Sequence, residues 1–483
     1  MANLVYDIKD KPKASQLIVL ALQQLLAILA ATIAVPTIIG LPTQIPAAIL
    51  GAGVGTLVYQ LFTKFKSPVF LGSSFAFLSS LGVAVAYGYC GIILGSVVAG
   101  LVYVAIAIVI HFVGTNWVDR LMPPVIIGPT VALIGLSLAG SAMGDIVRAN
   151  SSAIYGSYNL VSLLCGLVAF FVIIICSTQK KYKMAKLIPF ILGILAGYIV
   201  AAIFTAIGMA ANVDYLMIIN FQPIIDNFFM ADGTFKGVSA FVSFPQFAGL
   251  KAISEIMSGE LSPEILLANE NAQLINAGGI AEVVIAFLPV ALVVFAEHIA
   301  DHKNLSYIIG HDLIKEPGLK RTLLGDGVGS IAGTVFGICP NTTYGESVGC
   351  VAITRNASIV TITTTAIMCI ILSFISPVMA VLQTIPSCVM GGVCLTLYGF
   401  IAVSGLKMFK NLDLDDNKNL FVVASILISG IGGLSIQIPY AIAETGEITN
   451  TIQITSIATA LIIGITTNAI LTKIEKSKLG KGE

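Results

Sequence analysis

The sequence predicts an all-α membrane protein with 14 transmembrane segments in a 7+7 inverted repeat, whose third and tenth segments are short β-strand/half-helix elements. Three observations predict this: the composition, the recurrence of long apolar runs, and an echo between two short polar segments. Of the 483 residues, 57% are hydrophobic and only 10% are charged. A soluble globular chain has about 25% charged residues, so this chain cannot solvate its own surface and is expected to be polytopic.

Apolar runs close to the roughly 20 residues of a spanning helix recur along the whole chain, which favours helices over a barrel. Residues 209–279 form the one long non-apolar stretch and are expected to be a solvated extracellular insertion, amphipathic near 250–268. The expected spans are 16–41, 46–63, 67–82, 88–113, 123–140, 158–177, 187–208, 280–300, 325–338, 341–354, 358–380, 386–406, 419–434 and 448–472.

The charge distribution sets the expected orientation. An even number of spans puts both termini on one side. With loops sorted on that basis, only Arg148, Lys236 and Lys251 of the 25 basic residues fall on the opposite side, which leaves 22 on the side of the termini. Cytoplasmic loops carry the excess of Lys and Arg, so both termini are predicted to be cytoplasmic.

An internal echo links the two short polar spans. Ser73-Ser74-Phe75-Ala76 and Thr342-Thr343-Tyr344-Gly345 match position for position as hydroxyl, hydroxyl, aromatic and small residues. They occupy the third span of each set of seven. Because an odd number of spans reverses the direction of the second half, the echo indicates an inverted repeat.

The same two segments are poor helix interiors. Gly72-Ser73-Ser74 and Asn341-Thr342-Thr343 carry side chains that favour N-caps and turns. We therefore expect short extended pieces that lead into half-helices, whose N-terminal N–H groups face a ligand. The alternative is a pair of ordinary helices with Ser and Thr bonded to their own turns.

Two acidic residues are the candidate ligand groups. Glu297 lies near the end of the apolar run 280–299, and Glu346 follows the second polar segment. A carboxylate at membrane depth costs roughly 2.5–3.5 kcal/mol on insertion scales, which makes each a functional candidate. Burial favours the neutral acid and two nearby carboxylates discourage double ionisation, so a shared site can bind a proton together with its substrate.

Further titratable residues lie close by in the sequence. Asp301 is one helical turn beyond Glu297, and Asp326 opens the Gly-rich span; either is a candidate proton relay or a helix-end residue in solvent. His298 and His302 are interpreted as solvated or hydrogen-bonded. Their spacing suggests a metal, but no third ligand is nearby, so neither a metal nor a cofactor is expected.

At these residues the chain resembles the nucleobase–cation symporter-2 family, most closely its uracil permease branch. The similar stretches extend over nearly the whole membrane portion. They are Leu22-Gln23-Gln24-Leu25-Leu26-Ala27, Leu71-Gly72-Ser73-Ser74-Phe75-Ala76-Phe77, Ala296-Glu297-His298-Ile299, Pro340-Asn341-Thr342-Thr343-Tyr344-Gly345-Glu346, Ile353-Thr354-Arg355 and Ile385-Pro386-Ser387.

The resemblance implies a core domain and a gate domain. The core would comprise 16–113 and 280–380, and the gate 114–208 and 381–472, with 209–279 as the extracellular insertion. It further implies proton-coupled uracil import into a cell through its plasma (inner) membrane, by an elevator-type motion of the core past a homodimeric gate. Nucleic acid is not an expected partner, and the chain is not expected to be an enzyme.

The resemblance also implies roles for particular residues. Glu297 and Glu346 would accept the ring N–H groups of uracil, and the backbone N–H groups of Phe75 and Gly345 would donate to its carbonyls. Ser74 and Tyr344, in the same motifs, complete the expected substrate-binding set. The expected proton-coupling residues are Glu297, Asp301, Glu346 and Asp326.

Departures from the family pattern keep alternatives open. The usual Gln-His pair of the first span is Gln23-Gln24 here, Asp301 stands where some uracil permeases carry His, and Glu346 is followed by Ser347. Purine-type members carry Asp at the position of Asp301, so a xanthine or urate permease is the first alternative. An anion exchanger of the same 7+7 plan is less favoured, since two acids would repel an anion.

Overall fold

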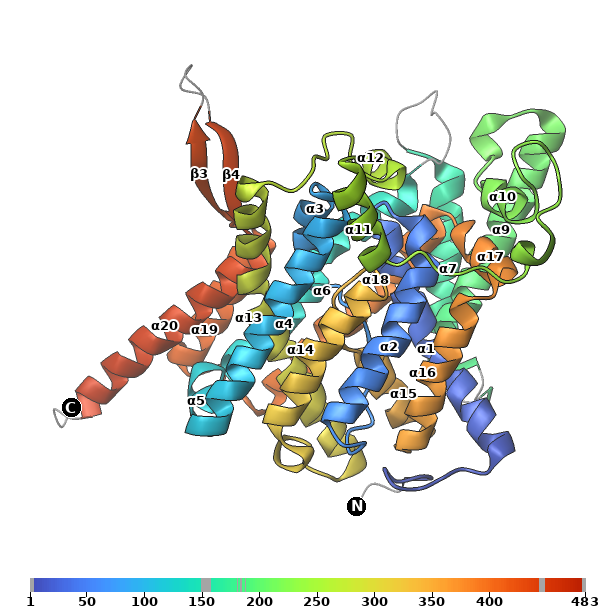
Figure 1. Cartoon of the computed structure of the whole chain (residues 1–483). Coiled ribbons are helices and arrows are strands. Elements are labelled where there is room, and N and C mark those ends of the chain that lie inside the picture. Colours follow the sequence, from blue (N-terminus) through green and yellow to red (C-terminus); the bar gives the residue numbers. More distant parts are fainter. Residues whose placement is uncertain are drawn as a thin grey trace.

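Long helices make up most of the molecule. The computed structural model describes residues 4–148, 158–179, 181–182, 185–186, 188–442 and 448–479, and Figure 1 shows the helices running side by side. Within these ranges, nine helices are long and apolar enough to cross a bilayer, and two more apolar helices have 15 residues each. The prediction of a mostly helical membrane protein is confirmed. The first residue of the expected span 187–208 lies outside the described ranges.

The first part of the chain contains most of the long helices. Proline residues occupy the first turns of α2, α6 and α9, where no intrahelical N–H donor is needed. The Asn159 side chain caps α7 by accepting the N–H groups of Val161 and Ser162 at 2.7 and 3.1 Å. The elements are α1 (Ala14–Ile38), η1 (Pro42–Gln44), α2 (Ile45–Phe62), β1 (Leu71–Ser73), α3 (Leu78–Val85), α4 (Gly88–Val113), α5 (Asn116–Leu121), α6 (Pro124–Val147), α7 (Leu160–Thr178) and α9 (Pro189–Ala211).

The insertion and the second part of the chain follow. The insertion holds η2 (Asp214–Leu216), α10 (Gln222–Phe228), η3 (Gly237–Ala240), α11 (Ala248–Ser258) and α12 (Pro263–Ala268). Beyond it lie α13 (Ala277–Ile309), η4 (Ile314–Gly318), α14 (Leu319–Val335), β2 (Asn341–Thr343), α15 (Gly345–Thr354), α16 (Ile359–Ser373), α17 (Ser376–Gln383), α18 (Ser387–Lys407), η5 (Met408–Asn411), α19 (Asn417–Ile431), β3 (Ile436–Ile442), β4 (Ile448–Ile454) and α20 (Ser456–Leu479).

Several element boundaries differ from the expected spans, and three of the differences have a clear cause. Helix α13 continues to Ile309, where Gly310 ends it in the left-handed conformation. Helix α14 starts at Leu319, ahead of the expected residue 325. Its first turns contain polar residues, which can form a helix but are not recognised as a span from hydropathy. The last expected span began at 448, but residues up to Ile454 form the antiparallel β3–β4 hairpin, which projects from the body in Figure 1.

The helices pack in two groups that each combine both parts of the chain. In the first group, α14 lies against α2 and α4, α16 lies against α1 and α2, and α13 lies against α3, α4 and α15. In the second group, α18 packs on α6, α7 and α9, and α19 packs on α6 and α20. Helices α1 and α13 also contact members of the second group.

Helices α2 and α14 approach each other closely because glycine lines their interface. A Cβ atom on Gly51 would lie 2.1 Å from the Gly333 carbonyl oxygen, so any larger residue would force the helices apart. Small residues allow such close backbone packing between helices in membranes. This close contact therefore fixes the position of α2 relative to α14, although the two helices come from different parts of the chain.

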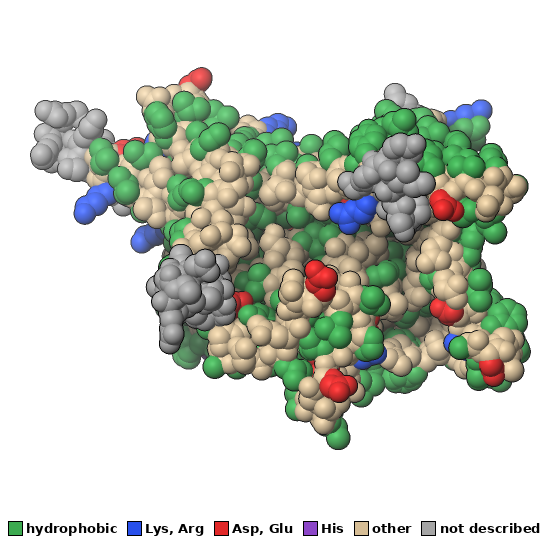
Figure 2. Space-filling model, turned by 90° about the horizontal axis from the view of Figure 1, so that it is seen from above, with side chains coloured by type: hydrophobic (Ala, Val, Ile, Leu, Met, Phe, Trp, Pro, Cys, Tyr) green, Lys and Arg blue, Asp and Glu red, His purple; other side chains and the backbone are tan. Residues whose placement is uncertain are grey.

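The insertion covers one end of the helices, opposite the end at which the described N-terminal segment lies (Figure 1). Helix α11 packs on α4 and α14. Glu255 on α11 is buried and accepts the backbone N–H groups of Tyr89 (2.9 Å) and Ser262 (3.1 Å). The expectation of a solvated insertion is wrong for this residue, because its carboxylate caps the start of α4. Figure 2 shows that charged side chains are sparse on this face.

Candidate functional site

Two three-residue strands lie together in the interior of the molecule. β1 pairs antiparallel with β2, in the register Leu71 with Thr343, Gly72 with Thr342 and Ser73 with Asn341. All six residues are buried, and short helices follow each strand, α3 after β1 and α15 after β2. The pairing satisfies backbone groups that would otherwise be unpaired in an apolar interior.

The surrounding helices hold the strands in place. Thr56 on α2 accepts the N–H of Leu71 at 2.9 Å, and the Asn341 amide donates to the Gly51 carbonyl of the same helix at 2.8 Å. A Cβ on Gly72 would lie 2.2 Å from the Tyr344 ring, so this ring can pack over β1 only because residue 72 is glycine. The segment is therefore a rigid platform.

The four candidate acids gather beside this platform. Glu297 and Asp301 lie on α13, Glu346 in the first turn of α15 and Asp326 on α14. The charges of Glu297, Asp301 and Glu346 lie within electrostatic reach of one another, and Asp326 is close to the first two. The structure thus brings together carboxyl groups from three separate helices.

The acids divide into two pairs by exposure. Glu297 and Glu346 are half-buried, whereas Asp301 is 6% exposed and Asp326 is fully buried. Asp301 accepts a hydrogen bond from the Thr343 hydroxyl at 2.7 Å, and Asp326 contacts the His298 ring at 2.6 Å. Neither aspartate is a helix-end residue in solvent, since α13 and α14 both extend past them.

The start of α15 borders open space, and Glu297 lies within electrostatic reach of Glu346 in its first turn. The Oε2 atom of Glu297 is buried and has no hydrogen-bond partner within the described part of the chain. Gly345 is exposed, and no atom of the described residues lies within 4 Å of a Cβ built on it or on Gly349, one turn later. A buried acceptor without a partner is costly, so this geometry suits a ligand that donates an N–H group.

The other expected binding residues directly follow the two strands. Ser74 and Phe75 follow β1 and are buried, and the Ser74 hydroxyl has no partner among the described residues. The Tyr344 hydroxyl donates to the Ser73 carbonyl at 3.0 Å and lies 3.4 Å from the Thr32 hydroxyl. The Tyr344 side chain is thus already hydrogen-bonded and braces β1 against α1.

Several residues at the site were not among the expected substrate-binding or proton-coupling residues. Tyr398 on α18 packs edge-on against Phe75, with ring centroids 5.4 Å apart, and Gln24 on α1 donates to the Ser347 hydroxyl at 2.6 Å. His298 and His302 are fully buried and hydrogen-bonded, so of the two interpretations, solvated or hydrogen-bonded, the structure confirms the second. Their position next to Glu297, one turn apart, was the available signal.

Sequence comparisons find relatives that match this chain over nearly its whole length. Residues 15–438 match the profile of the xanthine/uracil permease family, described as "Permease family". The chain is 35% identical to a uracil permease of Bacillus caldolyticus over 98% of its own length and 95% of the relative. It is 34% identical to a uracil permease of Bacillus subtilis over 99% of its length and 97% of the relative, and 31% identical to one of Escherichia coli K12 over 96% and 93%.

Solved structures share the fold at low sequence identity. The inward-facing murine anion transporter Slc26a9 matches with a TM-score of 0.63 at 12% identity, over 97% of this chain and 69% of that one. The transmembrane domain of the cyanobacterial bicarbonate transporter BicA matches with a TM-score of 0.51 at 13% identity, over 96% and 99%. These matches concern the fold alone.

The family profile and the full-length relatives agree that the chain is a transporter, not an enzyme, and that it belongs to the nucleobase–cation symporter-2 family of permeases.

Proposed function

We propose that this chain is a proton-coupled secondary transporter that imports uracil through the plasma (inner) membrane. The observation that carries the proposal is the buried Glu297 Oε2, which has no hydrogen-bond partner among the described residues, together with the open space at Gly345. Uracil offers two ring N–H donors and two carbonyl acceptors. The names of the full-length relatives, uracil permeases, point to the same substrate.

Each polar edge of uracil would meet a complementary group. Glu297 and Glu346 would accept the ring N–H groups, and the backbone N–H groups of Phe75 and Gly345 would donate to the carbonyls. The first N–H groups of α15 have no intrahelical acceptor, which suits this role. Ser74 would supply a further hydroxyl, and Tyr344 would hold β1 in position.

The proposed architecture is 14 spans in two inverted halves. The antiparallel pairing of β1 with β2 supports it, because inverted repeats bring equivalent elements together in opposite directions. The two packing groups support a core of 16–113 with 280–380 and a gate of 114–208 with 381–472. Residues 209–279 would form the extracellular insertion, and both termini would be cytoplasmic.

Transport would then proceed by an elevator motion. The core, which carries all four acids, would slide past a gate that forms the contact between two copies of the chain in a homodimer. Helices α1 and α13, which touch both packing groups, lie where such sliding would occur. Glu297, Asp301, Glu346 and Asp326 would take up the proton, because a cluster of acids within electrostatic reach cannot remain fully ionised in an apolar interior.

Uptake of radiolabelled uracil into proteoliposomes tests the proposal. We expect accumulation when the outside is made acidic, collapse of accumulation with a protonophore, and competition by unlabelled uracil well above that by xanthine or urate. Strong preference for xanthine would contradict the uracil assignment, and Asp301 is the residue that favours that alternative. Accumulation that follows a sodium gradient instead would contradict proton coupling.

A further inference from the structure

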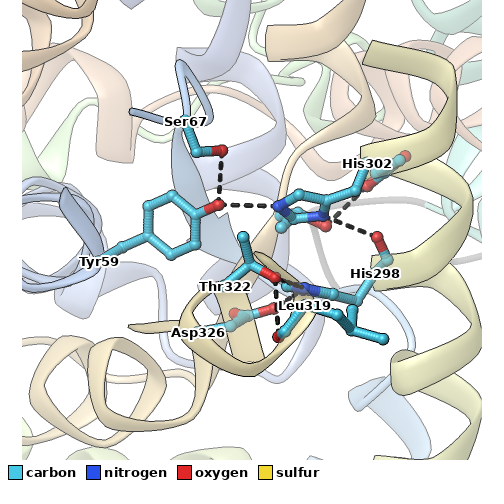
Figure 3. Close-up of polar contacts among 9 residues, drawn as sticks. Tyr59, Ser67, His298, His302, Leu319, Thr322 and Asp326 are labelled. Atoms are coloured by element: carbon cyan, nitrogen blue, oxygen red, sulfur yellow. Dashed lines mark hydrogen bonds and ion pairs between the residues drawn. The ribbon is translucent and has the colours of Figure 1, made fainter. Parts of the chain in front are cut away.

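A buried histidine–aspartate pair lies beside the proposed uracil site. His298 is 1% exposed and Asp326 is 0% exposed. Figure 3 shows the His298 ring between α13 and α14, with Nδ1 2.6 Å from Asp326 Oδ2 and Nε2 3.0 Å from the Thr322 hydroxyl. Both ring nitrogens are therefore engaged.

The hydrogen bonds fix the position of one proton. The Thr322 hydroxyl donates its single hydrogen to the Leu319 carbonyl at 3.0 Å, so it can only accept from His298. His298 Nε2 must then carry a proton. The short contact between Nδ1 and Asp326 Oδ2 holds one more proton, which resides either on the acid or on the imidazole, and the pair is neutral in both arrangements.

The second oxygen of Asp326 indicates on which group that proton resides. Asp326 Oδ1 is buried and has no partner within the described part of the chain. In a carboxylate this oxygen would carry about half of the negative charge without any compensation. A neutral acid that donates from Oδ2 to Nδ1 leaves only an uncharged carbonyl oxygen unpaired.

Other titratable groups surround the pair. Helix α13 carries Glu297, Asp301 and His302 as well as His298. The Tyr103 ring of α4 lies edge-on to the His298 ring, with ring centroids 6.1 Å apart. Glu346 of α15 lies within electrostatic reach of Glu297 and Asp301. His302 donates from Nδ1 to the His298 carbonyl at 2.8 Å, so its Nε2 accepts from the Tyr59 hydroxyl of α2 at 2.8 Å when the ring is neutral. This network keeps both imidazoles in fixed orientations.

We propose that Asp326 and His298 hold the transported proton between them, which makes His298 a coupling residue. This inference rests on the proposed proton-coupled function. Release of the proton from Asp326 Oδ2 to water on the inner side would leave a carboxylate against the Nδ1 lone pair, with a net charge of −1. Uptake of a proton from the outer side restores the neutral pair. The core would cross the membrane readily only with the pair neutral, because an uncompensated buried charge is costly.

The test separates coupling from substrate binding. In D326N, the amide N–H group still donates to His298 Nδ1, but the amide does not ionise and so cannot release or take up the transported proton. We expect D326N to lose uphill uracil accumulation in proteoliposomes, from about tenfold per unit of imposed pH step for one coupled proton to none. Exchange of labelled for unlabelled uracil, which requires no net proton movement, should persist. Wild-type accumulation by D326N would overturn the proposal.

A second variant and a control complete the design. H298Q keeps a donor toward Thr322 but offers Asp326 only an amide oxygen, which cannot take up the proton. It should show the same loss of accumulation with retained exchange, and it tests the proposal independently if D326N does not fold. E282Q changes a carboxylate on the same helix that accepts from Tyr87 and should accumulate like wild type. Absence of pH-driven uptake in the wild-type protein would refute the proposed function, whereas coupled D326N and H298Q would refute only this assignment.

Discussion

Helix α13 carries two polar stripes, one residue apart in sequence, whose hydrogen bonding differs. Asp301 accepts a hydrogen bond from Thr343 of β2, and Glu297 lies within electrostatic reach of Glu346 of α15. Glu297 Oε2 has no partner within the part of the chain that the structure describes. His298 and His302 face α14 and α2, and all four of their ring nitrogens contact polar partners. The first stripe therefore offers a free acceptor to a ligand, whereas the ring nitrogens of the second stripe are satisfied within the protein.

Loss of the carboxylate at Glu297 should have the largest effect. E297Q exchanges one acceptor oxygen for an N–H donor that would oppose a ring N–H of uracil. Hydrogen bonds to charged groups contribute about 1.5–3 kcal/mol, so binding should weaken by at least tenfold. Calorimetric titration of purified protein with uracil measures this, with E282Q as the matched control. Near-normal affinity of E297Q would show that the open stripe does not bind the ligand.

The link between the open stripe and the strand platform should matter next. Thr343→Val removes the hydroxyl that donates to Asp301 at 2.7 Å and leaves a buried acid without this partner. We expect a loss of about 1–3 kcal/mol in stability, together with reduced uracil uptake. Thermal unfolding and uptake assays check both. The control is Thr364→Val, since that hydroxyl only bonds the Val360 carbonyl within α16; equal effects of the two variants would contradict a special role for Thr343.

The complete stripe should respond to mutation in stability but not in affinity. Tyr59→Phe removes the hydroxyl that lies 2.8 Å from both His302 Nε2 and the Ser67 hydroxyl. The unpaired groups should cost about 1–2 kcal/mol, with uracil affinity unchanged. Denaturation in detergent measures the cost, and Tyr307→Phe, at a residue that is 88% exposed, is the control. A large loss of uracil affinity would mean that the two stripes are not separate.

The smallest expected effect lies outside the membrane portion, in the insertion. Partial burial alone would raise the pKa of Glu264, but the Lys251 ammonium 2.8 Å away, a backbone N–H and the Tyr89 hydroxyl together hold that pKa below the ordinary value. The resulting stabilisation is present above the unfolded-state pKa of about 4.3 and is lost as the pH falls through the folded-state value.

Lys251→Ala should therefore destabilise the protein by less than about 1 kcal/mol at neutral pH and by still less in acid. Unfolding transitions recorded across this pH range test the sign. A destabilisation that grows as the pH falls would contradict the assigned ion pair. Uracil affinity should not change, since Lys251 lies on α11 of the insertion.

Local chemistry made part of the site predictable from the sequence. Hydroxyl and amide side chains at 72–74 and 341–343 indicated extended backbone, and β1 and β2 lie there. An acid within an apolar run singled out Glu297 without any knowledge of its neighbours. Each of these inferences depends on the residue and its immediate context in the chain.

Features that depend on how helices face one another were not predictable. The His298–Asp326 contact requires a particular rotation of α13 against α14, and nothing in either segment specifies that rotation. Tyr398 reaches Phe75 from α18, whose sequence shows only an apolar run. Residues 448–454 were assigned to a helix because they lead directly into an apolar run, although Thr449, Asn450, Thr451 and Gln453 are polar.

The strand pairing has a consequence for biogenesis. The Tyr344 hydroxyl and the Ser73 carbonyl that it contacts are 271 positions apart in the chain. While only the part of the chain before β2 has been inserted into the bilayer, β1 has no strand with which to pair. Its backbone amide groups must then find hydrogen-bond partners in water or at the translocon. Maturation therefore cannot proceed span by span, and a chain truncated before β2 should be recognised by quality-control proteases as unfinished.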